Sequence, residues 1–253
     1  MTVMSVWRGL VAMGVGMALV ACSHQPPTPE WALAARDGTE RGNLAHLSGQ
    51  TRVAQAEWQR ARQAAASTGD PMAMARVALA QCAAQVASLQ LSPEPEPCTR
   101  ADVWLQAQPS AALAAYRRYL QGRVVDVADV ALLPVAHQAT APWLLAAPQA
   151  GVEGARERSA SPALDDARWT QALKTMPDPL SRLVAAAVVW RSGQAGPAVM
   201  AEAAATASAQ GWSRPLLAWL GLQAQWAERA GDMAQARQLR QRMEWVLNPL
   251  TTP

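Results

Sequence analysis

The sequence predicts an all-α protein, and three features support this fold class. Much of the 51% hydrophobic content is alanine, the residue with the highest intrinsic helix propensity. Phenylalanine is absent and tyrosine occurs only twice, so the 11 tryptophans supply nearly all of the aromatic bulk. Helix start and stop signals such as Asp-Pro, Gly-Pro and Gly-Asp recur along the chain. We therefore expect stacked antiparallel helix hairpins, arranged as an α-solenoid or as an irregular helical bundle.

Length and charge exclude several broad classes of protein. A chain of 253 residues can bury a sizeable core without a metal or a disulfide framework. It has a single long apolar run, which excludes a protein with several membrane spans. The net charge is +3, and the arginines are scattered among carboxylates without a run of like charges. We therefore expect no nucleic-acid partner.

The N-terminal residues 1–21 have the pattern of an export signal. Arg8 supplies a positive charge, and the apolar stretch from Leu10 to Ala21 is too short for a spanning helix of about 20 residues. The stretch ends in Leu19-Val20-Ala21-Cys22, which resembles the lipobox of bacterial lipoproteins. The resemblance implies cleavage before Cys22 and acylation of this residue. Ser23, which is not aspartate, implies sorting to the outer membrane, with the folded part facing the periplasm.

Residues 22–30 then form an extended tether, because proline-rich sequence such as His24 to Pro29 cannot continue a helix. The mature chain divides into an N-terminal helical region, 31–147, a flexible loop, 148–162, and a C-terminal region that resembles helical repeats, 163–248. The loop is predicted from its glycines, serines and proline.

Two cysteines are left once Cys22 is assigned to the lipid anchor. The periplasm is oxidising, so we expect Cys82 and Cys98 to form a disulfide. The alternative is one buried and one exposed thiol. The spacing is not Cys-x-x-Cys, and the sulfur count is too low for a zinc site.

Apolar periodicity and helix signals give the elements in order. The N-terminal region is expected to hold helices over 43–67, 71–90, 100–107 and 110–121. The segment 124–147 is ambiguous: its valines favour a strand, whereas Pro134 and the alanines favour a broken helix. The C-terminal region is expected to hold helices over 163–176, 179–192, 197–210, 215–230 and 232–247, with Ser213 as a candidate cap.

The last two helices carry matching apolar stripes. The first stripe consists of Leu216, Trp219, Leu220, Trp226, Ala227 and Ala230, and the second of Met233, Ala236, Leu239, Met243 and Val246. Arg237, Arg240 and Arg242 lie on the opposite face of the second helix. The junction Gly231-Asp232, with Ala236 in the next turn and Pro249 after the helix, resembles the tetratricopeptide repeat. The resemblance implies stacked helix hairpins that bury a continuous seam.

Candidate chemistry is sparse. The sequence has no recognisable hydrolase, zinc-protease or phosphate-loop motif. His24, His46 and His137 have no paired ligand at helical spacing, and Asp126 and Asp129 have no third ligand. Asp165 and Asp166 could bind a cation but suit the first turn of a helix. We therefore expect no enzyme activity, cofactor or metal.

Tryptophan is the remaining candidate for recognition. Because phenylalanine is absent, we expect most tryptophans to fill the core, namely Trp58, Trp190, Trp219, Trp226 and Trp245. Others near predicted loops or helix ends could line a peptide groove, namely Trp31, Trp104, Trp143 and Trp212.

The sequence favours a lipid-anchored periplasmic scaffold or adaptor for protein–protein interactions in cell-envelope assembly. Its membrane contact is the N-terminal lipid, and its protein partner is not identified by the sequence. The alternative is a peptidoglycan-acting enzyme or an activator of a peptidoglycan synthase, which predicts converging carboxylates or a protein-facing patch.

Overall fold

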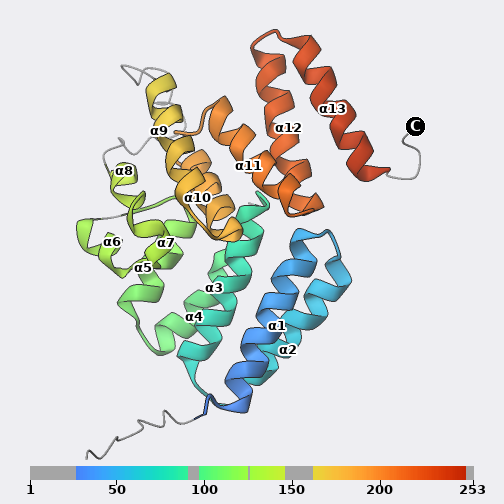
Figure 1. Ribbon diagram of the computed structural model, residues 1–253. Coiled ribbons are helices and arrows are strands. Elements are labelled where there is room, and N and C mark those ends of the chain that lie inside the picture. Colours follow the sequence, from blue (N-terminus) through green and yellow to red (C-terminus); the bar gives the residue numbers. More distant parts are fainter. Residues whose placement is uncertain (1–26, 91–96, 125, 146–161, 249–253) are drawn as a thin grey trace, which may run out of the picture.

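The structure of the chain is a computed structural model that describes residues 27–90, 97–124, 126–145 and 162–248. Within these ranges the chain forms thirteen α-helices and a 3₁₀ turn (Pro97–Thr99), and no residue lies in a strand. The predicted all-α fold of packed helix pairs is therefore confirmed (Figure 1). The helices are α1 (Glu30–Leu47), α2 (Thr51–Ala66), α3 (Pro71–Ala87), α4 (Arg100–Ala107), α5 (Ala111–Leu120), α6 (Val127–Leu132), α7 (Val135–Gln138), α8 (Ala141–Leu145), α9 (Pro162–Thr175), α10 (Pro179–Arg191), α11 (Pro197–Ala209), α12 (Ser213–Arg229) and α13 (Met233–Leu247).

Several expectations concern residues beyond these ranges. The export signal 1–21, the anchor Cys22 and most of the loop 148–162 lie outside the described residues. Among the residues that the structure describes, no helix combines the length and apolar character needed to cross a membrane.

The first hairpin differs from the prediction of one helix over 43–67. The structure has two helices here, α1 and α2, and the chain turns between them at Gly49, whose φ is +82°. Backbone hydrogen bonds close the turn, with the amide of Gln50 donating to the carbonyl of Ala45 at 2.8 Å. No aspartate or proline marks this helix break in the sequence, so apolar periodicity alone predicted one helix instead of two.

Small residues allow α1 and α2 to pack closely. A Cβ added at Gly42 would lie 2.4 Å from the Trp58 ring, so only glycine fits beside this indole. The Trp58 indole Nε1 donates to Asn43 Oδ1 at 2.9 Å, which satisfies its polar atom inside the contact. The predicted burial of Trp58 is confirmed.

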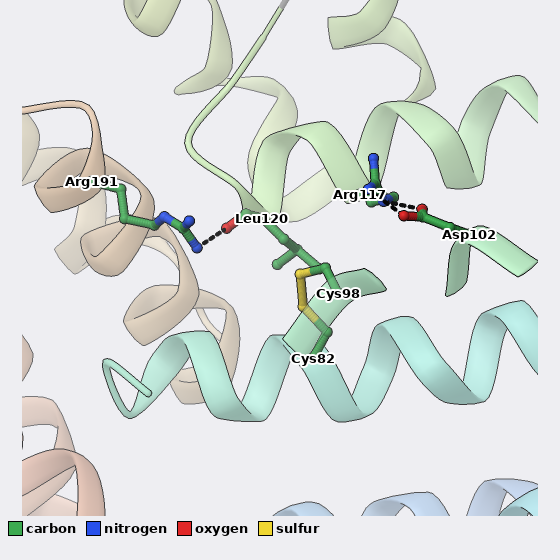
Figure 2. Close-up of a disulfide and its surroundings, with 6 residues drawn as sticks. All are labelled: Cys82, Cys98, Asp102, Arg117, Leu120 and Arg191. Atoms are coloured by element: carbon green, nitrogen blue, oxygen red, sulfur yellow. Dashed lines mark hydrogen bonds and ion pairs between the residues drawn. A yellow bond between two sulfur atoms is a disulfide. The ribbon is translucent and has the colours of Figure 1, made fainter. Parts of the chain in front are cut away.

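The α3 helix is joined covalently to the segment before α4. Cys82, in α3, forms the predicted disulfide with Cys98, in the 3₁₀ turn (Figure 2). Both cysteines are buried. An ion pair between Asp102 of α4 and Arg117 of α5 lies nearby. The disulfide holds the start of α4 against α3, and the ion pair joins α4 to α5.

Within the ambiguous segment 124–147, the described residues 126–145 are mostly helical. They form the three short helices α6, α7 and α8, with a helix break at Pro134, so the strand alternative is wrong. Asp126 caps α6 by accepting a hydrogen bond from the amide of Asp129 at 2.9 Å. The valines in this segment do not produce a strand, because Pro134 removes a backbone donor and no neighbouring strand is available among the described residues.

The C-terminal helices follow the predicted boundaries within two residues. Asp178 caps α10 and Asp232 caps α13, as their positions before Pro179 and Met233 predict. The expected cap at Ser213 is wrong, because Ser213 is the first residue of α12 and Trp212 occupies the cap position.

A single large apolar cluster links the two halves of the chain. It contains residues from α1 to α13, including Leu47, Leu79, Tyr119, Leu183, Trp219 and Leu239. The α12 helix reaches across to the N-terminal helices: the Trp219 indole Nε1 donates to the carbonyl of Ala87 at 3.3 Å. Arg214 donates to the carbonyl of His46 at 2.7 Å and to Thr51 Oγ1 at 2.6 Å.

Candidate interaction surface

The tryptophans divide into buried and exposed groups in a way that the sequence predicted only in part. Trp219 is fully buried as expected, and Trp190 is partly buried. The core prediction is wrong for Trp226 and Trp245, which are 43% and 48% exposed. The reason is that α13 packs mainly on α12, so the outer side of this last hairpin has no further helix against it among the described residues.

The four tryptophans predicted near loops do not gather at one groove. They come from α1, α4, α8 and the turn before α12. Trp212 is buried, and Trp31 and Trp104 are partly buried. Trp143 packs edge-on against Trp169 with 5.0 Å between ring centroids, and the guanidinium of Arg168 lies 3.7 Å above its ring. These contacts give Trp143 a packing role between α8 and α9.

The α13 surface is the strongest candidate for recognition. We use this name for the five exposed side chains of α13 that line a shallow hollow of about 430 Å³: Arg237, Gln238, Gln241, Arg242 and Trp245. Neighbouring members of this set are three or four residues apart, which places them on one side of the helix. The buried residues Ala236 and Leu239 lie on the opposite side, against α12.

The charge of the α13 surface is positive and uncompensated locally. Neither Arg237 nor Arg242 forms an ion pair or hydrogen bond with another described side chain, whereas Arg240 pairs with Glu228 of α12. The only carboxylate of α13 is Glu244, which accepts a hydrogen bond from Asn248 and does not line the hollow. Two free guanidiniums therefore flank two amides and one indole.

The sequence indicated part of the α13 surface. It correctly placed the arginines of α13 on the face opposite the apolar stripe. It assigned Trp245 to the core, although Trp245 lies eight residues after Arg237 and four after Gln241, on the arginine side. The helical spacing of Arg237, Gln241 and Trp245 was the signal that could have identified this surface.

The candidate carboxylates have structural partners. Asp129 pairs with Arg118, and Asp126 is a helix cap. Asp166 is buried, and its carboxylate accepts backbone hydrogen bonds at the start of α11. In the described residues no three histidine, cysteine or acidic side chains gather as a metal site would require.

His46 and His137 are both buried, while His24 lies outside the described residues. Burial lowers the pKa of His137 to about 4, and the nearby charge of Asp178 opposes this shift. The imidazole Nδ1 of His137 lies 3.1 Å from the hydroxyl of Tyr119, whose pKa is raised by burial. The ring of Tyr116 stacks on His137. The group packs α5 against α7, with Tyr119 and His137 buried and Tyr116 partly buried.

Comparisons with known proteins identify no family for this chain: no protein-family model matches it, and neither curated proteins nor solved structures give a significant match. The assignment of stacked helix pairs therefore rests on the structure alone.

Proposed function

We propose that the chain is a lipid-anchored periplasmic scaffold or adaptor that mediates protein–protein interactions in cell-envelope assembly. The observation that carries this proposal is the α13 surface, where exposed aromatic and unpaired cationic side chains lie together. Exposed tryptophan and arginine are the residues most enriched in the energetically important parts of protein interfaces.

The position of this surface suits an anchored scaffold. The described chain enters α1 at one end of the molecule, and the α12–α13 hairpin lies at the other end (Figure 1). An N-terminal lipid on Cys22, followed by the tether 22–30, would therefore hold the α13 surface away from the membrane. The hairpins resemble tetratricopeptide repeats at Gly231, Asp232 and Ala236, and a stack of such hairpins provides a rigid support for a terminal surface.

Site-specific photo-crosslinking in cells tests the proposal. A photoreactive amino acid at Gln241 is expected to give crosslinks to a defined envelope protein. The same amino acid at exposed Arg76, on α3, serves as the control and is expected not to give this product. Crosslinks that are identical at both positions, or absent at Gln241, would contradict an adaptor that acts through α13.

A further inference from the structure

The α13 surface has a chemistry that selects its partner. Two unpaired guanidiniums in one hollow attract carboxylates, because arginine presents a planar set of donors that matches a carboxylate. Gln238 and Gln241 lie between them and offer both amide donors and acceptors. Trp245 supplies an exposed ring at the C-terminal end of the row.

We propose that the α13 surface binds an acidic segment of a partner protein that presents two carboxylates with an apolar side chain between them. This inference rests on the proposed function and specifies its ligand. The carboxylates pair with Arg237 and Arg242, the two glutamines hydrogen-bond the backbone of the segment, and the apolar side chain packs on Trp245.

The arrangement of the arginines constrains where the acids must lie. Arg237 and Arg242 are five residues apart on α13, which separates them by about 7.5 Å along the helix axis and by about 140° around it. The two guanidiniums therefore lie on either side of the hollow, and one carboxylate of the bound segment is needed on each side. Trp245 is a further three residues along the helix, about 4.5 Å, and lies between the two arginines around the axis. The apolar side chain that packs on its ring therefore lies between the acids.

The same features disfavour a lipid surface as the occupant. An amphipathic helix that lies on a membrane presents a broad apolar face. The α13 surface has a single apolar ring among four polar side chains, while Ala236 and Leu239 of α13 are buried against α12. A peptide backbone also offers partners for Gln238 and Gln241, which acyl chains do not.

Fluorescence anisotropy with defined peptides tests this inference on the purified protein. The probe is a labelled synthetic peptide that contains Asp-Asp-Leu-Asp-Asp in a neutral context, and the control peptide carries asparagine in place of all four aspartates. We expect the acidic peptide to bind at least about tenfold more tightly than the control peptide, and its affinity to fall as salt is raised.

Matched variants assign the binding to α13. The double variant Arg237→Glu with Arg242→Glu is expected to weaken peptide binding at least about tenfold. Trp245→Ala should weaken it without changing its salt dependence. The control Arg52→Glu with Arg76→Glu changes the net charge equally at exposed positions on α2 and α3 and should leave affinity unchanged.

Several outcomes would overturn the inference. These are equal binding of both peptides, equal loss in both double variants, or a preference for anionic phosphatidylglycerol vesicles that depends on Arg237 and Arg242. Self-association that disappears in the Arg237→Glu/Arg242→Glu variant would likewise replace the acidic partner with a second copy of the chain. Failure of peptide binding with retained crosslinks at Gln241 would reject the acidic ligand and leave the adaptor function standing.

Discussion

The Asp166 carboxylate occupies the space that a side chain at position 196 would need. A Cβ added to Gly196 would lie 2.5 Å from the Asp166 carboxyl carbon. The carboxylate accepts hydrogen bonds from the amides of Gly196 at 3.0 Å, Ala198 at 2.8 Å and Val199 at 3.0 Å. A residue of α9 thus caps α11, a helix that begins 31 positions later in the sequence.

Loss of this cap is expected to be costly. Asp166→Ala leaves three backbone donors without their acceptor, and we expect the free energy of unfolding to fall by about 2–3 kcal/mol. Asp232→Ala removes one exposed cap bond, to Gln235, and should cost about 1 kcal/mol. Urea unfolding of both variants gives the comparison, and equal losses would show that the three bonds act as an ordinary single cap.

The small residue at the α12–α13 contact predicts a contrast between neighbouring positions. Ala236 is 1% exposed, whereas Arg237 faces solvent. Ala236→Glu places a carboxylate in an apolar contact and should cost several kcal/mol and unfold the C-terminal hairpin. Arg237→Glu should change stability by less than about 0.5 kcal/mol. Circular dichroism melts test this, and equal melting temperatures would contradict the packing of α13 on α12.

The disulfide is expected to contribute stability without being required for the fold. Cys82 and Cys98 are 16 residues apart, and closing a loop of this length stabilises by about 3 kcal/mol in the chain-entropy account. The Cys82→Ala/Cys98→Ala variant should keep its helical spectrum and melt at a lower temperature. Alkylation of the unreduced, unfolded protein should modify neither cysteine, and modification of both would show that the bond does not form.

Acid is expected to destabilise the protein through its buried histidines. Burial and the charge of Arg214 lower the pKa of His46 to about 4, below its ordinary 6.5. Between these two pH values the unfolded chain binds a proton that the folded chain does not, so stability is full above pH 6.5 and falls as the pH drops toward 4. The loss from His46 is about 3 kcal/mol. His46→Gln should flatten the dependence of unfolding free energy on pH, and an unchanged slope would show that His46 titrates normally.

The anchor prediction concerns Cys22, outside the described residues. Cys22→Ser should accumulate as an uncleaved, unlipidated precursor, because acylation and cleavage both depend on this thiol in the lipoprotein resemblance. Mass spectrometry of the N-terminal peptide and carbonate-washed membrane fractions test this. A variant that stays in the outer-membrane fraction after the wash would show that something other than the lipid holds the protein.

The features predicted from the sequence depend on local chemistry. Asp70, Asp178 and Asp232 each accept a hydrogen bond from an amide two or three residues ahead, so the start of each helix is encoded beside it. Gly69 and Gly231 follow the preceding helices and have positive φ, so the ends of these helices are also encoded locally in the sequence. The fold class and most helix bounds follow from such signals.

The features that could not be predicted depend on distant partners. Nothing near Asp166 in the sequence indicates that its carboxylate meets α11, and nothing near Gly49 marks the end of α1 beyond the glycine itself. The exposure of Trp226 and Trp245 depends on whether another helix covers α13, which periodicity along one helix does not reveal. The α13 surface was missed because its tryptophan was assigned to the core.

The hydrogen bonds from α12 to the N-terminal helices affect the order in which parts of the chain can fold. In an open array of repeats each unit contacts only its neighbours, and folding can propagate along the chain as it emerges. Here Trp219 and Arg214 bond to Ala87 and His46, 132 and 168 positions earlier. These bonds join segments that are far apart in the sequence, and the first helices cannot complete their burial until α12 has been made. A truncation before residue 213 would leave Ala87 and His46 without these partners. In the intact chain, the N-terminal helices and α12 should unfold together as one cooperative unit.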